Sequence, residues 1–97
     1  MVKHIVTFKF TGTPAERRSV ADKFKTALEA LPSQIPVLKS IEVGINQNPG
    51  EDWDLVLTAI VPTMADVEIY AKHPAHVAAA GITSGHRDSR ACVDYEF

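Results

Sequence analysis

Residues 2–16 read VKHIVTFKFTGTPAE and join a strand pattern directly to the start of a helix. Over residues 2–10 the side chains alternate between a more apolar set and a more polar set, which is the period of a β-strand. Thr13, Pro14 and Glu16 then occupy the N-cap, first and third positions of a helix. This combination is the signature of a capping box with proline in the first turn. The stretch therefore predicts a strand that passes almost immediately into a helix.

The helix that follows has a single apolar face. Pro32 and Pro36 mark its end, because proline lacks the N–H that a helix interior needs. Helical spacing places the following residues on one side: Val20, Phe24, Ala27, Leu28 and Leu31. We expect this face to pack against the core.

Two further stretches have the alternating pattern of strands. Residues 37–45 carry apolar side chains at most odd positions, and residues 53–61 do so throughout. Residues 46–50 read NQNPG, a composition typical of turns. We therefore expect two strands that pair as a hairpin.

The last third of the chain predicts a second helix and a final strand. Thr63 stands at a helix N-cap position, and helical spacing follows until Pro74 interrupts or bends the helix. The small residues 77–81 continue it for a turn, residues 83–88 have the composition of a loop, and residues 91–97 alternate as a strand.

The predicted order of elements is βαββαβ, without a repeat or a linker, and we expect one domain over residues 1–97. An α+β sandwich of ferredoxin-like topology satisfies this order. Two helices cover only one face of a four-stranded sheet, yet apolar residues remain for the other face: Ile5, Leu38, Val56 and Ile60. A second copy packed sheet against sheet would cover them. We therefore expect a homodimer that forms a dimeric α/β barrel.

Charge and composition exclude several classes of partner. Ten basic and twelve acidic residues give a net charge of −2, and the basic residues are scattered, so nucleic acid is not expected as a partner. Residues 1–10 lack the continuous apolar segment of a signal peptide, and no run approaches the ~20 apolar residues that cross a bilayer. We expect a cytoplasmic protein with no membrane partner.

The sequence offers little for a metal or a cofactor. Cys92 is the only cysteine, so neither an intrachain disulfide nor a thiolate cluster can form within one chain, and we expect an inert strand cysteine. His73 and His76 are three residues apart, but the proline between them disturbs the geometry and no carboxylate completes a ligand set. We predict no metal site and no cofactor, while a hard cation held by backbone oxygens stays open.

Residues 70–76, YAKHPAH, bring together one phenol and two imidazoles, which are groups that transfer protons. His4 lies on the more apolar face of the first strand, which we expect beneath the helices. A cavity lined by His4, Tyr70 and His76 is geometrically reasonable. We expect His76 to act as a base, Tyr70 to donate a proton and His4 to orient one of them, in aldol or enolisation chemistry.

Several segments taken together resemble the stress-responsive A/B barrel domain family, also called the Dabb domain. They are VKHIV at 2–6, FKF at 8–10, WDL at 53–55, HPAH at 73–76 and VDY at 93–95. The resemblance covers nearly the whole chain and implies the βαββαβ fold and a sheet-to-sheet dimer. Some plant members are polyketide cyclases, in which a histidine and a tyrosine promote an intramolecular aldol closure without a cofactor.

By position, the resemblance carries these two catalytic roles to His76 and Tyr70, and it matches His4 and His73 with further pocket histidines. We expect a small hydrophobic or carbonyl-bearing ligand, contacted by these further residues: His73, Phe24 and Val77. After His76 the chain has small residues where relatives commonly have bulky ones, which changes the shape of the pocket.

An alternative interpretation assigns the same residues to packing. His4 is then a core histidine satisfied by one partner, His73 caps the bent helix, and Tyr70 packs with its hydroxyl at the rim. The protein would be a non-enzymatic, stress-associated dimer without a catalytic pocket.

Overall fold

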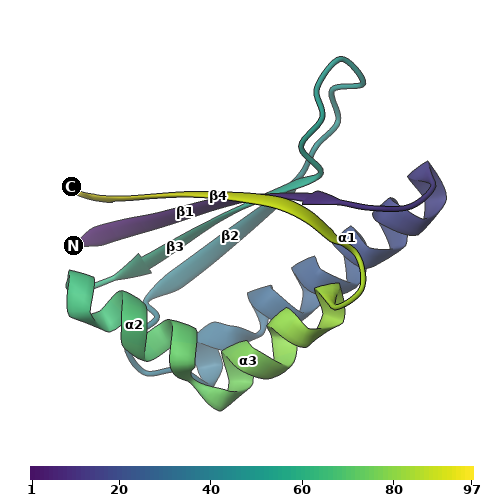
Figure 1. Cartoon of the computed structure of the whole chain (residues 1–97). Helices are drawn as coiled ribbons and strands as arrows, with labels where there is room; N and C mark the ends of the chain where they lie inside the picture. Colours follow the sequence, from purple (N-terminus) through teal and green to yellow (C-terminus); the bar gives the residue numbers. More distant parts are fainter.

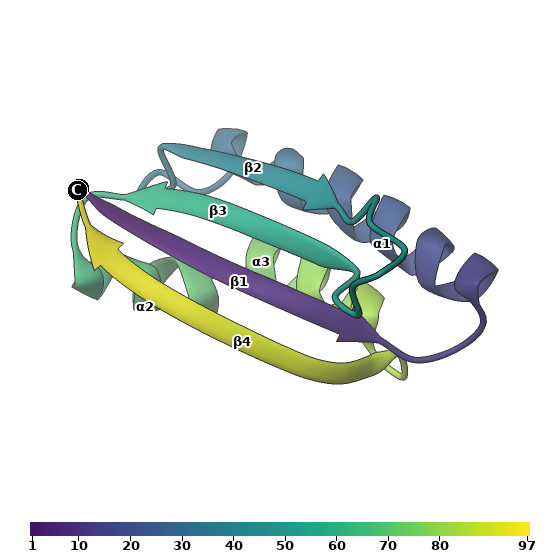
Figure 2. The ribbon, with the colours of Figure 1, turned by 90° about the horizontal axis from the view of Figure 1, so that it is seen from above.

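A computed structural model describes residues 1–97 as a four-stranded antiparallel sheet with three α-helices on one face (Figure 1). The strands are β1 (Val2–Phe10), β2 (Ser40–Ile45), β3 (Leu55–Val61) and β4 (Arg87–Glu96). The helices are α1 (Pro14–Glu29), α2 (Met64–Lys72) and α3 (Pro74–Ala80), with 3₁₀ turns η1 (Leu31–Ser33) and η2 (Gly81–Thr83). The strand order is β2-β3-β1-β4 (Figure 2). The chain thus has the predicted α+β, ferredoxin-like fold.

The predicted cap of α1 is confirmed. The backbone N–H of Glu16 donates to Thr13 Oγ1 over 3.2 Å, and the N–H of Thr13 donates to Glu16 Oε1 over 3.4 Å. Thr63 and Asp66 form the same reciprocal cap at the start of α2. Each cap satisfies N–H groups that the first turn of a helix leaves unpaired, so both helix starts are set by local sequence.

The hairpin strands are shorter than the alternation predicts. β2 begins at Ser40 rather than at position 37, because the N–H of Leu38 donates to the Ile35 carbonyl in a turn that precedes the strand. Leu38 is buried in the core, so its predicted place on the opposite face of the sheet is wrong. β3 begins at Leu55 rather than at position 53, since the ladder of the hairpin starts with the pair of Ile45 and Leu55.

The second helical region consists of two helices that meet at His73. The backbone of His73 is extended, with φ −62° and ψ 135°, and Pro74 occupies the first turn of α3. Proline disfavours the helical conformation in the residue before it, which explains the break. α3 therefore starts at Pro74 as a helix of its own, instead of being a continuation over 77–81. None of the helices combines the length and apolar character that crossing a membrane requires.

The final strand begins earlier than predicted. β4 starts at Arg87 rather than at Ala91, so the predicted loop over 83–88 ends sooner, and β4 ends at Glu96. Its first half is polar and lacks the alternation that marks a strand. This half is nevertheless a strand, because β4 pairs with the whole length of β1, from Phe10 opposite Arg87 to Val2 opposite Glu96.

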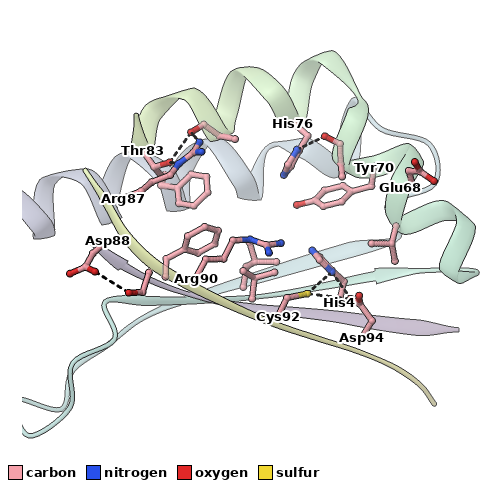
Figure 3. Close-up of a pocket in the computed structure, with 18 of the residues that line it drawn as sticks. His4, Glu68, Tyr70, His76, Thr83, Arg87, Asp88, Arg90, Cys92 and Asp94 are labelled. Carbon is pink, nitrogen blue, oxygen red and sulfur yellow. Dashed lines mark hydrogen bonds and ion pairs between the residues drawn. The ribbon is translucent and has the colours of Figure 1, made fainter. Parts of the chain in front are cut away.

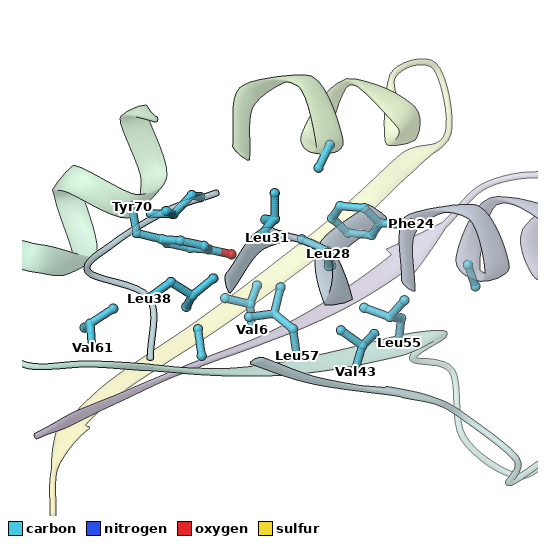
Figure 4. Close-up of a cluster of buried hydrophobic side chains, with 14 of the residues drawn as sticks. Val6, Phe24, Leu28, Leu31, Leu38, Val43, Leu55, Leu57, Val61 and Tyr70 are labelled. Atoms are coloured by element: carbon cyan, nitrogen blue, oxygen red, sulfur yellow. The ribbon is translucent and has the colours of Figure 1, made fainter. Parts of the chain in front are cut away.

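The hydrophobic core lies between the sheet and the helices (Figure 4). The predicted apolar face of α1 is buried there through Val20, Phe24 and Leu28, against strand residues such as Val43 and Leu57. Each fully buried aliphatic or aromatic side chain contributes about 1.5–3 kcal/mol to folding. All three helices lie on the same face of the sheet: α1 runs along β2, and α2 and α3 lie toward the β1–β4 side (Figures 1 and 2). α1 thus supplies most of the helical part of the core, while α2 and α3 border the cavity described below.

The other face of the sheet has no helices on it. It presents Ile5, Val56, Ile60, Val93 and Tyr95, with Val93 62% and Tyr95 42% exposed. We call these five residues the open face.

Candidate functional site

A cavity of about 710 Å³ lies between β1 and β4 on one side and α2 and α3 on the other (Figure 3). Its apolar lining includes Val6, Phe8, Phe24, Leu57 and Val67. The polar groups that matter for its chemistry are the following: His4, Tyr70, His76, Arg90, Cys92 and Asp94. A mostly apolar cavity with a few convergent polar groups is the usual form of a small-molecule site.

His76 lies on the first turns of α3, and one ring nitrogen is already engaged. The break at Pro74 lets the ring reach back to α2, where Nδ1 lies 2.8 Å from the Ala71 carbonyl oxygen. A carbonyl oxygen only accepts hydrogen bonds, so Nδ1 carries the hydrogen and Nε2 carries the lone pair. Figure 3 shows the other ring nitrogen pointing toward the cavity. The neutral imidazole thus presents a base to whatever occupies the cavity.

Burial lowers the pKa of His76 below its ordinary value of 6.5; the Ala71 hydrogen bond opposes the shift, and the charges of His4 and Arg90 add to it. The ring is therefore neutral at pH 7. This protonation state is the one that a general base needs.

Tyr70 is buried, yet its hydroxyl forms no hydrogen bond within the protein. Its ring lies 4.5 Å from that of His76 and meets the His4 ring edge to face at 5.9 Å, measured between centroids. Burial raises the pKa of Tyr70 above its ordinary value, and Arg90 opposes the shift only in part. Tyr70 is therefore a protonated donor beside a neutral base. The alternative prediction that the hydroxyl lies at the rim is wrong.

His4 and Asp94 form a hydrogen-bonded pair across neighbouring strands. They are directly opposite in the β1–β4 register, and His4 Nδ1 lies 2.5 Å from Asp94 Oδ1. Because an ionised carboxylate only accepts, Nδ1 of His4 donates and its other nitrogen is left for the cavity. This is the partner that a buried histidine requires, and it fixes the orientation of the ring beside Tyr70.

The sequence-predicted site residues divide into two groups. The cavity brings together His4, Tyr70, His76 and Phe24. His73 instead caps α3, with its Nδ1 accepting from the Ala75 N–H over 3.1 Å, and it is not among the residues that line the cavity. Val77 follows His76 on α3 but is 58% exposed and also lies outside the lining.

Six residues of β4 line the cavity, and none of them is among the predicted site residues. Arg90, Cys92 and Asp94 alternate along the strand and all point to the helix side of the sheet. Asp94 belongs to the VDY segment at 93–95, which carries the family resemblance, and that resemblance is the only sequence signal that points to Asp94 as a site residue. Arg90 lies in a stretch whose polar composition conceals the strand.

The His4, Cys92 and Asp94 donor atoms lie within 4.8 Å of one another, close enough for a single metal ion to reach all three. The His4–Asp94 hydrogen bond already uses two of these atoms. Burial and the Asp94 charge raise the pKa of the Cys92 thiol, with Arg90 opposing, so the sulfur keeps its proton when no ion is bound. In this structure the three side chains form one hydrogen-bonded cluster.

The model of the family described as Stress responsive A/B Barrel Domain matches residues 2–97. A comparison with curated proteins finds no match.

Solved structures extend this similarity. A dimeric protein of unknown function and ferredoxin-like fold from Bacteroides fragilis is 50% identical, with a TM-score of 0.96 over 99% of this chain and 95% of that one. A dimeric ferredoxin-like protein of unknown function from Thermobifida fusca is 28% identical, with a TM-score of 0.78 over 99% and 90%. A hydroxynitrile lyase from Passiflora edulis, 15% identical, shares the fold with a TM-score of 0.77 over 97% and 90%.

Proposed function

The chain belongs to the stress responsive A/B barrel domain family, and from this premise we propose that it is a homodimer that binds a small carbonyl-bearing molecule between helices and sheet and acts on it by acid–base chemistry without a cofactor. One observation carries the proposal. A buried tyrosine hydroxyl without a partner lies beside a neutral histidine in a cavity of about 710 Å³. A substrate oxygen would supply the hydrogen bond that the protein does not.

The chemistry follows from the two protonation states. His76 Nε2 takes a proton from the carbon next to a carbonyl group, and the electron pair of that C–H bond forms an enolate. The Tyr70 hydroxyl donates a hydrogen bond to the enolate oxygen. The enolate carbon then bonds to a second carbonyl of the same molecule, and the alkoxide so formed takes back the proton from His76. Each well-placed group of this kind typically contributes about 10²–10⁴-fold to the rate.

His4 and Asp94 have a positioning role in this scheme. The carboxylate holds the His4 ring in one tautomer, and the ring meets Tyr70 edge to face at 5.9 Å. The orientation of the phenol is therefore set by a pair of residues that lie on two strands of the sheet.

Assembly as a homodimer is supported by the open face. Val56, Val93 and Tyr95 are exposed in the single chain and Ile5 and Ile60 are partly exposed, and apolar area of this kind is stabilised when another surface covers it. The Bacteroides fragilis relative, half identical to this chain, is described as dimeric. A second copy related by a two-fold axis would pack the same face against itself.

The first step can be tested alone with 4-phenylbutan-2-one in D₂O, by following exchange of the hydrogens next to its carbonyl by NMR. We expect the protein to accelerate exchange, and we expect His76→Ala to remove at least nine-tenths of that acceleration. The matched control is His86→Ala, since His86 lies outside the cavity lining. An equal loss in both variants, or none in His76→Ala, would contradict the role of His76.

The pH dependence of exchange has a defined sign. A base must be neutral to act, so the rate should rise with pH through the pKa of His76 and then level off. Since burial lowers that pKa, the midpoint is expected below 6.5. A midpoint above 6.5 would mean that another group is the base.

A further inference from the structure

Arg90 lines the cavity and, although it is exposed to solvent in the single chain, it brings a positive charge to the cavity wall. It lies opposite Phe8 in the β1–β4 register, so its side chain is on the helix side of the sheet. Figure 3 shows the guanidinium reaching into the space between Tyr70 on the helix side and Cys92 on the sheet side. A cationic group in this position faces the same volume as the proposed base and proton donor.

No carboxylate neutralises Arg90. The ion pairs of the chain are His4–Asp94, Arg17–Asp54, Arg18–Asp22, Lys25–Glu29 and Lys72–Glu68. Two of the three acidic residues that line the cavity are thus engaged, Asp94 by His4 and Glu68 by Lys72. The third, Asp88, accepts a hydrogen bond from Ser89. The guanidinium is therefore free to bind something else.

Arg87 provides a contrast on the same strand. It also lines the cavity, but its guanidinium donates to Thr83 Oγ1 over 2.6 Å and to the Ala80 carbonyl over 2.8 Å. These bonds attach the start of β4 to the end of α3. Arg87 has a structural role, whereas Arg90 has neither a carbonyl nor a carboxylate partner and its side-chain contact is with the Cys92 thiol.

The field of Arg90 reaches the reacting groups. Burial is the largest influence on the pKa of Tyr70, His76 and Cys92, and the Arg90 charge acts in the same direction at all three by lowering it. A charge that acts at both the proposed base and the proposed donor also acts on a molecule placed between them. It favours a molecule with a negative charge.

We propose that Arg90 binds a carboxylate of the ligand, so that the substrate class is a keto acid with an apolar end. This assignment rests on the proposed function and narrows it. The planar guanidinium matches a carboxylate with two parallel hydrogen bonds. With the carboxylate at Arg90, the carbonyl lies toward Tyr70 and His76, and the apolar end lies toward Phe8 and Phe24.

Binding without turnover tests this assignment. The probes are phenylacetate, 3-phenylpropanoate and 4-phenylbutanoate, each beside its neutral amide, with affinities measured by calorimetry. We expect at least one acid to bind about 10- to 100-fold more tightly than its amide, as a charge-assisted pair typically provides. Arg90→Gln should remove this preference by weakening the binding of the acid much more than that of its amide. Arg90→Lys should keep part of it, because a lysine retains the charge but not the paired geometry.

Two controls separate this proposal from the catalytic one. Arg18→Gln changes an arginine on α1 that pairs with Asp22 outside the cavity, and it should leave the acid preference intact. His76→Ala should still bind the acids, even though it has lost exchange activity. The carboxylate site is rejected if acids and amides bind equally, if none of the acids binds, or if Arg90→Gln keeps the preference. Acid binding through Arg90 without ketone exchange would uphold the site and reject the proposed catalysis.

Discussion

At the scale of single residues, Tyr70 shows a conflict between stability and chemistry. The residue is 1% exposed, and its hydroxyl is the one buried side-chain polar atom without a hydrogen bond. Leaving a buried donor unpaired costs about 1–3 kcal/mol. A residue kept in this state is more easily explained by its reactivity than by its packing.

Replacing Tyr70 by phenylalanine should therefore stabilise the fold and lower the proposed exchange activity. Tyr70→Phe keeps the ring and removes the unpaired hydroxyl, so we expect the free energy of unfolding to rise by about 1 kcal/mol in urea titrations. Exchange of 4-phenylbutan-2-one should fall in the same variant. Tyr95→Phe is the matched control for exchange, because Tyr95 lies on the open face, outside the cavity lining, and its loss of a hydroxyl should leave the exchange rate unchanged. A less stable Tyr70→Phe variant would mean that the hydroxyl is satisfied in solution.

The residue types of the site could be predicted from sequence, but only part of their placement could. Tyr70 and His76 are close in the sequence and on the same helical region, so their meeting needs little long-range information. Asp94 reaches His4 only through the β1–β4 register, which no local pattern reveals. Val77 lies outside the cavity lining, contrary to the prediction, because α3 begins as a separate helix at Pro74. With His76 turned to the cavity, the next residue lies about 100° further round the helix and faces solvent.

At the scale of elements, the start of α1 gives a test that does not involve the cavity. Thr13→Ala removes one half of the capping box and should lower the free energy of unfolding by about 0.5–2 kcal/mol, as measured by urea titration. The control is Thr26→Ala within the same helix, where the threonine hydroxyl donates to the Asp22 carbonyl and is exposed. That change should be neutral or slightly stabilising, since alanine is the better helix former. Equal losses at both positions would remove the cap as the explanation.

The same contrast explains which element boundaries could be predicted. The caps of α1 and α2 depend on residues within one turn, so their sequence signals are reliable. The start of β4 depends on the length of the free edge that β1 offers, and residues 87–90 pair there despite their polar composition. The start of β2 depends on the turn at Ile35 and Leu38. The alternation of side chains in the sequence depends on neither the pairing with β1 nor the turn before β2, so it cannot predict these two boundaries.

At the scale of the whole molecule, the open face gives a prediction about assembly. Val93→Asp puts a charge on the β4 side of this face, opposite Ile5, and should convert the proposed dimer to a monomer in analytical ultracentrifugation. Val77→Asp is a closely matched control, because this valine is 58% exposed against 62% for Val93 but lies on α3, in the helical layer. It should sediment as the unaltered protein does. A dimer that persists in Val93→Asp would place the interface elsewhere.

The alternation along β4 has a consequence for how this protein can change over evolutionary time. Arg90, Cys92 and Asp94 face the cavity, while Val93 and Tyr95 between and beyond them face the other way. Substitutions at Arg90, Cys92 or Asp94 alter the cavity lining, and those at Val93 or Tyr95 alter the open face, so the two surfaces can change independently. Loss or gain of one residue within the strand would exchange the two sets and damage both at once. β4 should therefore tolerate varied composition in related chains and keep a constant length.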